Sequence, residues 1–157
     1  HAGSRPRRGL RLLGRRLELP RDRHHRAKPS SGPTRACVPD LAQLGMENVA
    51  AYEAELGAYL HRQLSSLPVR IYGPDPAAGH ARAALCAFNA EGAHAADVAT
   101  FLDQDGFAIR AGHHCTQPLH DVLGAAGSAR ASLYIYNTHE EVDAFVDALG
   151  STLLLLS

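Results

Sequence analysis

The sequence predicts an α+β fold in which helices cover a small β-sheet. From residue 44 onward, helical and strand patterns follow one another in the order helix, strand, strand, helix, strand, loop, strand, helix. The chain contains no internal repeat and no glycine-rich phosphate-binding loop. These observations favour a single layered domain over residues 44–157.

The first 43 residues differ sharply from this domain. Residues 1–35 hold 11 of the 16 Lys and Arg residues but only two acids, so a net charge of +0 conceals a strongly basic start and an acidic remainder. The segment is rich in Arg, Pro and Gly and has little apolar periodicity, so we expect a disordered or mis-assigned basic tail. A nucleic-acid-binding arm or a targeting peptide is a weaker alternative, and nucleic acid is not an expected partner.

The first half of the domain carries clear boundaries. Apolar residues at helical spacing predict a long amphipathic helix from Leu44 to Leu67, and Pro68 closes it. Two β-type runs follow at 69–72 and 83–89, separated by Gly and Pro, and we expect them to pair. A second helix is expected at 94–104, ended by Gly106.

The second half predicts a short strand at 107–110, a shaped loop around Cys115, a strand at 131–136 and a final helix. In the later strand, Leu133 and Ile135 are expected on one face and two tyrosines on the other. Residues 138–141 read Thr-His-Glu-Glu, a capping box that begins the final helix.

The number of cysteines and the length of the apolar runs limit the kind of protein to be expected. Cys37, Cys86 and Cys115 are an odd number and widely separated, which fits a reducing compartment better than a disulfide framework. No apolar run approaches the ~18 residues that a membrane-spanning helix needs, so no membrane partner is expected. Cys86 lies in an apolar strand and is expected to be structural, and Cys37 has no context that suggests a function.

The most specific segment is Arg110-Ala-Gly-His-His-Cys115-Thr-Gln-Pro-Leu-His120. A thiol is nucleophilic as the thiolate, and a neighbouring Arg or protonated His favours that form. Gly112 and Pro118 bracket the cysteine and predict a loop, where reactive groups are often placed. His120 is expected to be a solvated loop residue.

This segment, with Ala129-Arg130-Ala-Ser-Leu-Tyr-Ile-Tyr-Asn-Thr138-His-Glu-Glu141 further on, resembles the C-terminal region of the group II, SufS-like cysteine desulfurases of the class V aminotransferase superfamily, which include plastid NifS-like proteins. The resemblance covers roughly residues 44–150. It implies the small C-terminal domain of a fold-type I transferase that depends on pyridoxal phosphate.

The resemblance also implies a chemistry. In this family pyridoxal phosphate acts as an electron sink while sulfur leaves L-cysteine, and a protein thiolate holds that sulfur as a persulfide for iron–sulfur cluster assembly. By motif position Cys115 matches the nucleophile, Arg130 matches the arginine that holds the substrate carboxylate, and Arg110 is assigned with it to substrate binding. His113 and His114 match the surrounding pocket.

One part of the family pattern is missing. The family carries its cofactor lysine in a Ser-x-His-Lys context within a large preceding domain, whereas Lys28 is the only lysine here and lies among Arg and Pro. The chain also begins with His1. We therefore expect a C-terminal fragment, joined near residue 44 to an unrelated segment, that does not bind the cofactor alone and is inactive by itself.

Two alternatives stay open. The chain could be a stand-alone persulfide carrier or interaction module, or His113, His114 and Cys115, with His120, could bind zinc. For the complete enzyme the family implies a homodimer, a SufE-like sulfur acceptor, and a location in the plastid stroma or the bacterial cytoplasm.

Overall fold

The structure is a computed structural model that describes residues 44–157, so the expectations for the basic tail and for Cys37 lie outside the described residues. Its elements in chain order are α2 (Met46–Leu64), β1 (Val69–Tyr72), the short 3-10 helix η1 (Pro76–Ala78), β2 (Leu85–Ala90), α3 (Ala95–Gln104), β3 (Arg110–Gly112), α4 (Gln117–Leu123), β4 (Ser128–Ser132) and α5 (His139–Leu156).

The strands form one antiparallel sheet in the order β1-β2-β4-β3. The expected pairing of the first two strands is confirmed, with Val69 opposite Ala90 and Tyr72 opposite Ala87. β4 then inserts between β2 and β3, although it comes last in the chain. This crossover brings the end of β3, where the cysteine loop begins, beside β4.

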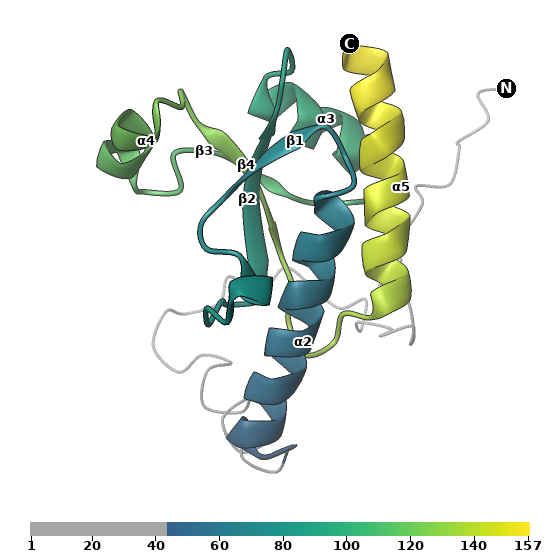
Figure 1. Cartoon of the computed structure of the whole chain (residues 1–157). Coiled ribbons are helices and arrows are strands. Elements are labelled where there is room, and N and C mark those ends of the chain that lie inside the picture. The colour runs from purple at the N-terminus through teal and green to yellow at the C-terminus, as the bar shows by residue number, and fades with distance from the viewer. Residues whose placement is uncertain (1–43) are drawn as a thin grey trace, which may run out of the picture.

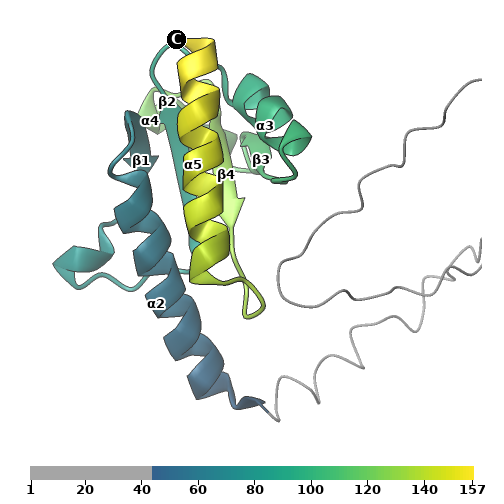
Figure 2. The same cartoon turned by 90° about the vertical axis from the view of Figure 1, so that its right-hand side faces the viewer.

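Helices α2, α3 and α5 pack together on one face of the sheet, and α4 lies on the opposite side of the sheet from α5 (Figures 1 and 2). The core between the helices and the sheet consists of apolar side chains from both layers. Its fully buried members include Leu56, Leu60, Leu102, Leu149 and Phe88. Burial of each such side chain stabilises the fold by about 1.5–3 kcal/mol relative to its exposure.

Helix α2 fits closely against the sheet and α5. At Gly57 an added Cβ would lie 3.1 Å from the Cα of Ala84, so a larger residue there would push α2 away from the start of β2. On the outer side, the Tyr59 hydroxyl donates to Asp143 of α5 at 2.6 Å, and Gln63 donates to the same oxygen at 2.8 Å. These bonds join the two longest helices.

The helix boundaries agree well with the sequence. His94 caps α3 by accepting from the amide of Ala96, and Gly106 follows the helix with a φ of 91°. The capping box that begins α5 is confirmed, because the Thr138 hydroxyl accepts from the Glu141 amide and the Glu141 carboxylate accepts from the Thr138 amide. Each bond satisfies an amide that has no partner within the helix.

Three expectations in the second half were wrong in detail. The expected loop around Cys115 is shorter, because α4 begins at Gln117 and places Pro118 in its first turn, where proline is favoured. The strand expected at 107–110 begins its pairing only at Arg110. The strand expected at 131–136 instead spans Ser128–Ser132.

The last of these shifts has a local cause. The Asn137 side chain accepts from the Tyr134 amide at 2.8 Å, and the Asn137 amide bonds to the Tyr134 carbonyl, so residues 134–137 form a turn. The expected facing is nevertheless retained, with Leu133 and Ile135 half-buried and Tyr134 and Tyr136 exposed. Side-chain alternation therefore extends beyond the hydrogen-bonded ladder.

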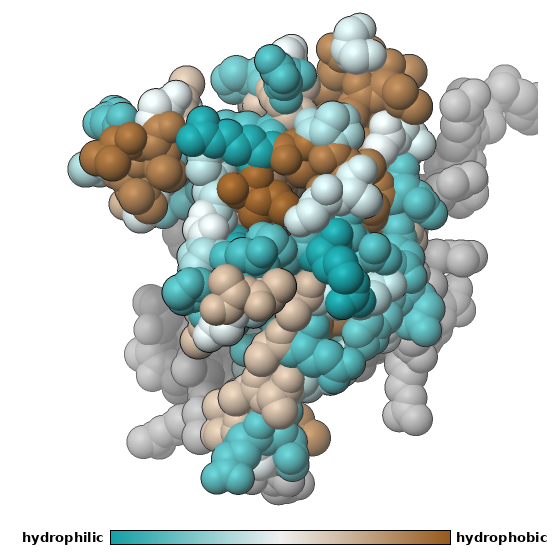
Figure 3. Space-filling model, viewed as in Figure 1, coloured by the Kyte–Doolittle hydropathy of each residue, from teal (hydrophilic) through white to brown (hydrophobic). Residues whose placement is uncertain are grey.

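In the part of the chain that the structure describes, no helix combines the length and apolar character needed to cross a bilayer. Among the exposed apolar side chains, four lie in two groups. Figure 3 shows them on α4, at the upper left, and at the C-terminal end of α5, at the upper right. The residues are Leu119 and Val122 on α4, and Leu154 and Leu155 on α5.

Candidate active site

The face of the sheet opposite α2, α3 and α5 carries two arginines side by side. Arg110 of β3 stands directly opposite Arg130 of β4, and Arg130 in turn stands opposite Ala87 of β2. Residues paired in this way project to the same face of a sheet. Two like charges placed directly opposite each other are unfavourable unless an anion lies between or above them.

Neither guanidinium is neutralised by an acid within residues 44–157. The four strands contain no Asp or Glu, and neither arginine forms an ion pair with a described residue. The Nε of Arg130 is also buried and lacks a hydrogen-bond partner among these residues. Two unpaired guanidiniums with a free donor form a site suited to a carboxylate, which Arg binds through paired N–H groups.

Cys115 lies in the turn between β3 and α4 and its side chain is exposed. Its φ is 63°, and that of His114 is 51°, so two consecutive residues other than glycine adopt the left-handed conformation. This conformation is costly for residues with a Cβ and is often found at functional sites. The turn therefore presents the thiol at the edge of the sheet by means of a strained backbone.

His114 is tied to β4. Its Nε2 lies 3.0 Å from the carbonyl oxygen of Ser128 and 3.1 Å from the Ser128 hydroxyl, while its Nδ1 is buried without a partner among the described residues. Burial, and then the positive charge of Arg130, lower the pKa of His114, with a smaller contribution from Arg110. His114 therefore shares the electrostatic environment of the two arginines and precedes the thiol directly.

His113 and His120 pack against each other, and only His120 differs from its expectation. His113 is exposed, and its ring packs edge-on against that of His120 at 5.5 Å. The expectation that His120 is a solvated loop residue was wrong, because it lies in α4 with only 4% of its surface exposed. Its two ring nitrogens bond to the Thr116 carbonyl and the Ser128 hydroxyl.

Ser128 is the residue that sequence reasoning missed entirely. It is 1% exposed and its hydroxyl contacts both His114 and His120. A single serine after a glycine gives no signal of this role in the sequence. Only the crossover that places β4 beside β3 reveals it.

The other cysteine in the described part has a different environment. Cys86 is fully buried in β2, and burial raises the pKa of its thiol to about 11. It is therefore a packed, protonated side chain, as expected. Residues 44–157 also contain no group of three or more His, Cys, Asp and Glu side chains arranged to bind a metal ion, so the geometry gives no support to the zinc alternative.

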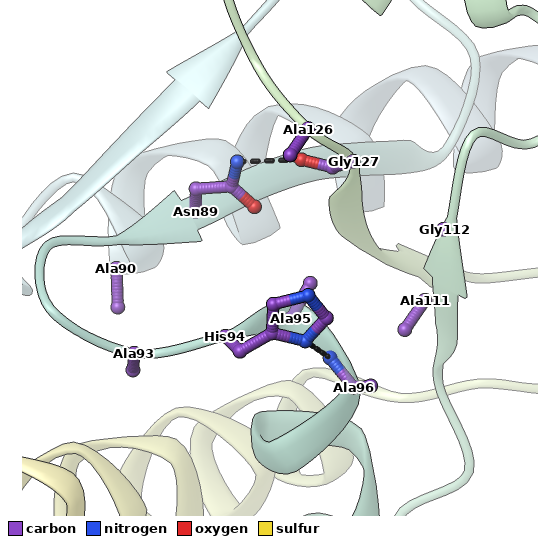
Figure 4. A pocket seen from close by; sticks show the side chains of 10 residues that line it. All are labelled: Asn89, Ala90, Ala93, His94, Ala95, Ala96, Ala111, Gly112, Ala126 and Gly127. Atoms are coloured by element: carbon purple, nitrogen blue, oxygen red, sulfur yellow. Dashed lines mark hydrogen bonds between the residues drawn. The ribbon is translucent and has the colours of Figure 1, made fainter.

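A cavity of about 260 Å³ lies beside the cysteine loop but does not include the thiol. It is lined mainly by alanine and glycine, including Gly112 and Gly127 at its boundary with β3 and β4 (Figure 4). Asn89 donates to the Gly127 carbonyl at 2.7 Å, and the His94 ring accepts from the Ala96 amide, so both polar side chains serve the local backbone. The arginines and the thiol do not line this cavity.

Together these features define a small α+β domain that carries an exposed thiol and two unpaired guanidiniums on strands β3 and β4 and the turn after β3. Residues 35–145 match the family model described as aminotransferase class-V. Because the match covers more than half of the sequence, the chain belongs to the class-V aminotransferase family.

Its relatives carry a more specific name. A probable cysteine desulfurase from Synechocystis sp. is 57% identical over 123 residues, which are 78% of this chain and 29% of that protein. The apo structure of a cysteine desulfurase from Thermococcus onnurineus NA1 is 33% identical with a TM-score of 0.71, and the match covers 77% of this chain and 30% of that one. The cysteine desulfurase CsdA from Escherichia coli, in an S-sulfonic acid form, is 32% identical with a TM-score of 0.68 over 78% and 29% of the two chains.

These likenesses confirm the expected fold class, the α+β small domain of these transferases. The chain spans less than a third of the length of the curated relatives it matches.

Proposed function

We propose that this chain is the C-terminal, sulfur-accepting part of a SufS-like cysteine desulfurase that converts L-cysteine to L-alanine. The Cys115 thiolate attacks the sulfur of the substrate, so that a sulfur–sulfur bond forms as the carbon–sulfur bond of L-cysteine breaks. The electron pair of the broken bond stays with the carbon skeleton, which takes up a proton to give L-alanine. The persulfide on Cys115 then supplies iron–sulfur cluster assembly. The observation that carries this proposal is the pair of unneutralised guanidiniums, Arg110 and Arg130, on the strands that flank the cysteine loop.

The two arginines supply the substrate site. Free L-cysteine carries a carboxylate, and a planar guanidinium binds a carboxylate through two parallel N–H donors. Arg130 is the better placed because its Nε is buried, which strengthens an ionic hydrogen bond relative to one in water. Arg110 is exposed and adds a second positive charge from the neighbouring strand.

The described domain does not by itself fit pyridoxal phosphate. Residues 44–157 contain no lysine, so they offer no side-chain amine to form an imine with the aldehyde of the cofactor. The cofactor would be held by the part of the relatives that this chain does not span. We therefore propose that residues 44–157 are inactive alone and work within a longer, dimeric protein.

A sulfur acceptor would approach Cys115 over α4. Leu119 and Val122 on that helix are exposed, which is unfavourable for a surface that always faces water. A SufE-like protein that covers them would reach the thiol directly. The carrier alternative, uptake of persulfide without its generation, remains the second candidate because Cys115 is exposed in the isolated domain.

A chimeric enzyme tests the proposal. Residues 44–157 would replace the matching C-terminal segment of the Synechocystis relative, and release of alanine and sulfide from L-cysteine would be measured. We expect an active chimera that Cys115→Ser inactivates, whereas Cys86→Ala, in the buried thiol, retains activity. A folded chimera that binds the cofactor but forms no alanine would contradict the proposal and leave the carrier alternative.

The substrate site has its own variants in the same chimera. Arg130→Gln removes an ionic hydrogen-bond partner worth about 1.5–3 kcal/mol, so kcat/KM for L-cysteine should fall by roughly 10- to 100-fold. Arg70→Gln is the matched control, because Arg70 is an exposed arginine of the same sheet on the distant strand β1. Equal losses in the two variants would show that Arg130 does not bind the carboxylate.

A further inference from the structure

Two buried polar residues beside the cysteine loop have no part in the function proposed above. His120 of α4 is 4% exposed and Ser128 of β4 is 1% exposed. The Ser128 hydroxyl lies within hydrogen-bond distance of the rings of both His114 and His120. Buried polar groups of this kind are stable only when their donors and acceptors are matched. Here the hydrogen-bond partners of His114 and His120 determine which ring nitrogen of each histidine carries the proton.

The bond from His120 to the loop fixes the first proton. Its Nδ1 lies 3.1 Å from the Thr116 carbonyl oxygen, which can only accept, so Nδ1 carries the proton and donates. In a neutral imidazole the other nitrogen then accepts. The Ser128 hydroxyl, 3.0 Å from Nε2, is the donor that it accepts from.

The bonds of His114 fix the second proton in the opposite place. Its Nε2 lies 3.0 Å from the Ser128 carbonyl oxygen, so Nε2 is the protonated nitrogen and donates to that carbonyl and to the Ser128 hydroxyl oxygen. Nδ1 of His114 is then an unprotonated nitrogen, buried and without a partner among the described residues. The lowered pKa of His114, due first to burial and then to Arg130, agrees with this neutral form.

His120 and Ser128 anchor the strained turn at its two ends. Thr116 donates to the His113 carbonyl through its amide and its hydroxyl, both at 2.8 Å, and its own carbonyl accepts from the His120 ring. On the other side, Ser128 holds the ring of His114. The left-handed pair His114 and Cys115 is thus anchored to α4 and to β4.

We infer that Ser128 and His120 are positioning residues for Cys115: they hold His114 as the Nε2–H tautomer and thereby maintain the left-handed turn that presents the thiol. Neither residue contacts the thiol in this role. Both act through His114 and the Thr116 carbonyl. The effect on turnover rests on the proposed function, whereas the tautomers are properties of the chain itself.

Nitrogen-15 NMR of the full 157-residue chain tests the tautomers without any assay of activity. Long-range correlations between ring protons and nitrogens would be recorded near pH 7.5, with signals assigned through His114→Gln and His120→Asn. We expect opposite neutral tautomers, Nε2–H for His114 and Nδ1–H for His120. A His114 ring protonated on Nδ1 would overturn the inference.

Variants of Ser128 link the network to these signals. Ser128→Ala removes the hydroxyl that donates to Nε2 of His120, so we expect the Nε2 signal of His120 to shift toward that of a nitrogen that accepts no hydrogen bond, while the Thr116 carbonyl keeps Nδ1 protonated. Ser128→Thr keeps a hydroxyl and should restore the wild-type pattern. Ser132→Ala, an exposed serine on the same strand, is the matched control and should change nothing.

The same variants in the chimera test the positioning role. Loss of one buried hydrogen bond is worth about 1 kcal/mol, which corresponds to about a fivefold fall in kcat, with KM for L-cysteine unchanged because the arginines are intact. Ser128→Thr should recover kcat. An active chimera in which Ser128→Ala and His120→Asn both retain wild-type kcat would overturn the role, whereas an inactive parent chimera would refute the proposed function and leave the NMR result standing.

Discussion

The two faces of the sheet show opposite physical conditions. On the face toward α2, α3 and α5, Phe88 and Cys86 of β2 are fully buried among apolar side chains. On the other face, Arg110 and Arg130 stand opposite each other without an acid, and His114 has a buried nitrogen without a partner in the described part of the chain. The side chains of the covered face are packed within the domain, whereas these charged and polar groups of the other face lack partners among the described residues.

This difference separates stability from chemistry within a single small domain. The covered face supplies the apolar burial that stabilises the fold. The open face and the adjoining turn hold unpaired charge, an exposed thiol and a left-handed backbone, each of which costs free energy in the isolated domain. Under the proposed function, the substrate carboxylate would offset the unpaired charge of the two arginines.

The largest expected effect is on the covered face. Phe88 is fully buried at the centre of the core, so Phe88→Ala should lower the free energy of unfolding by about 3–5 kcal/mol. Urea titration followed by circular dichroism would measure this. The loss is a large fraction of the 5–15 kcal/mol typical of a domain.

The control substitutions for Phe88→Ala lie on α4, on the side of the sheet that α2, α3 and α5 do not cover. We call this the open side. Leu119 and Val122 of α4 are 54% and 84% exposed, so alanine at either position should change the free energy of unfolding by less than about 0.5 kcal/mol. If Leu119→Ala lowered the free energy of unfolding as much as Phe88→Ala, the open side would also stabilise the fold, and the contrast between the two sides would be wrong.

The sequence predicts the covered face well, because burial there leaves a periodic pattern. The spacing of Leu56, Leu60 and Leu64 predicts α2, and the Thr138 and Glu141 pair predicts the start of α5 within one residue. These features depend only on residues near one another in the chain, so local rules apply to them.

The open side is less predictable because its contacts are long-range. The motif gives the identities of Cys115 and Arg130, yet not the register that sets Arg130 opposite Arg110. His120 looks like a loop residue until β4 places Ser128 against its ring. Nor does any pattern announce that His114 and Cys115 adopt positive φ, since both residues usually avoid it.

A smaller effect is expected at the strained turn. Cys115 has a φ of 63° and is exposed, so its replacement removes little packing. Glycine adopts this conformation without steric cost and alanine does not, so Cys115→Gly should be more stable than Cys115→Ala by about 1 kcal/mol. Thermal and urea unfolding of the two variants would measure the difference. Equal stabilities would mean that the turn is not strained, and the contrast between the faces would then rest on charge alone.

The smallest expected effect is a pH dependence that arises on the open side. The folded pKa of His114 is lowered, so below its ordinary value of 6.5 the unfolded chain binds a proton that the folded chain resists. Stability should therefore fall as the pH drops from about 7.5 through 6.5 and on toward the folded pKa, and the penalty is absent above this window.

The groups that face the ring are Arg130 and Arg110 on the strands, His120 on α4, and the carbonyl and hydroxyl of Ser128. In His114→Gln the side-chain amide can still donate to the Ser128 carbonyl but does not titrate, so the variant should lose less stability than the wild type between about pH 7.5 and pH 5.5. Urea titrations of both proteins at the two pH values would measure this. If both lose the same amount, His114 accepts its proton freely in the folded domain, and the open side does not hold it in the neutral form that the hydrogen bonds imply.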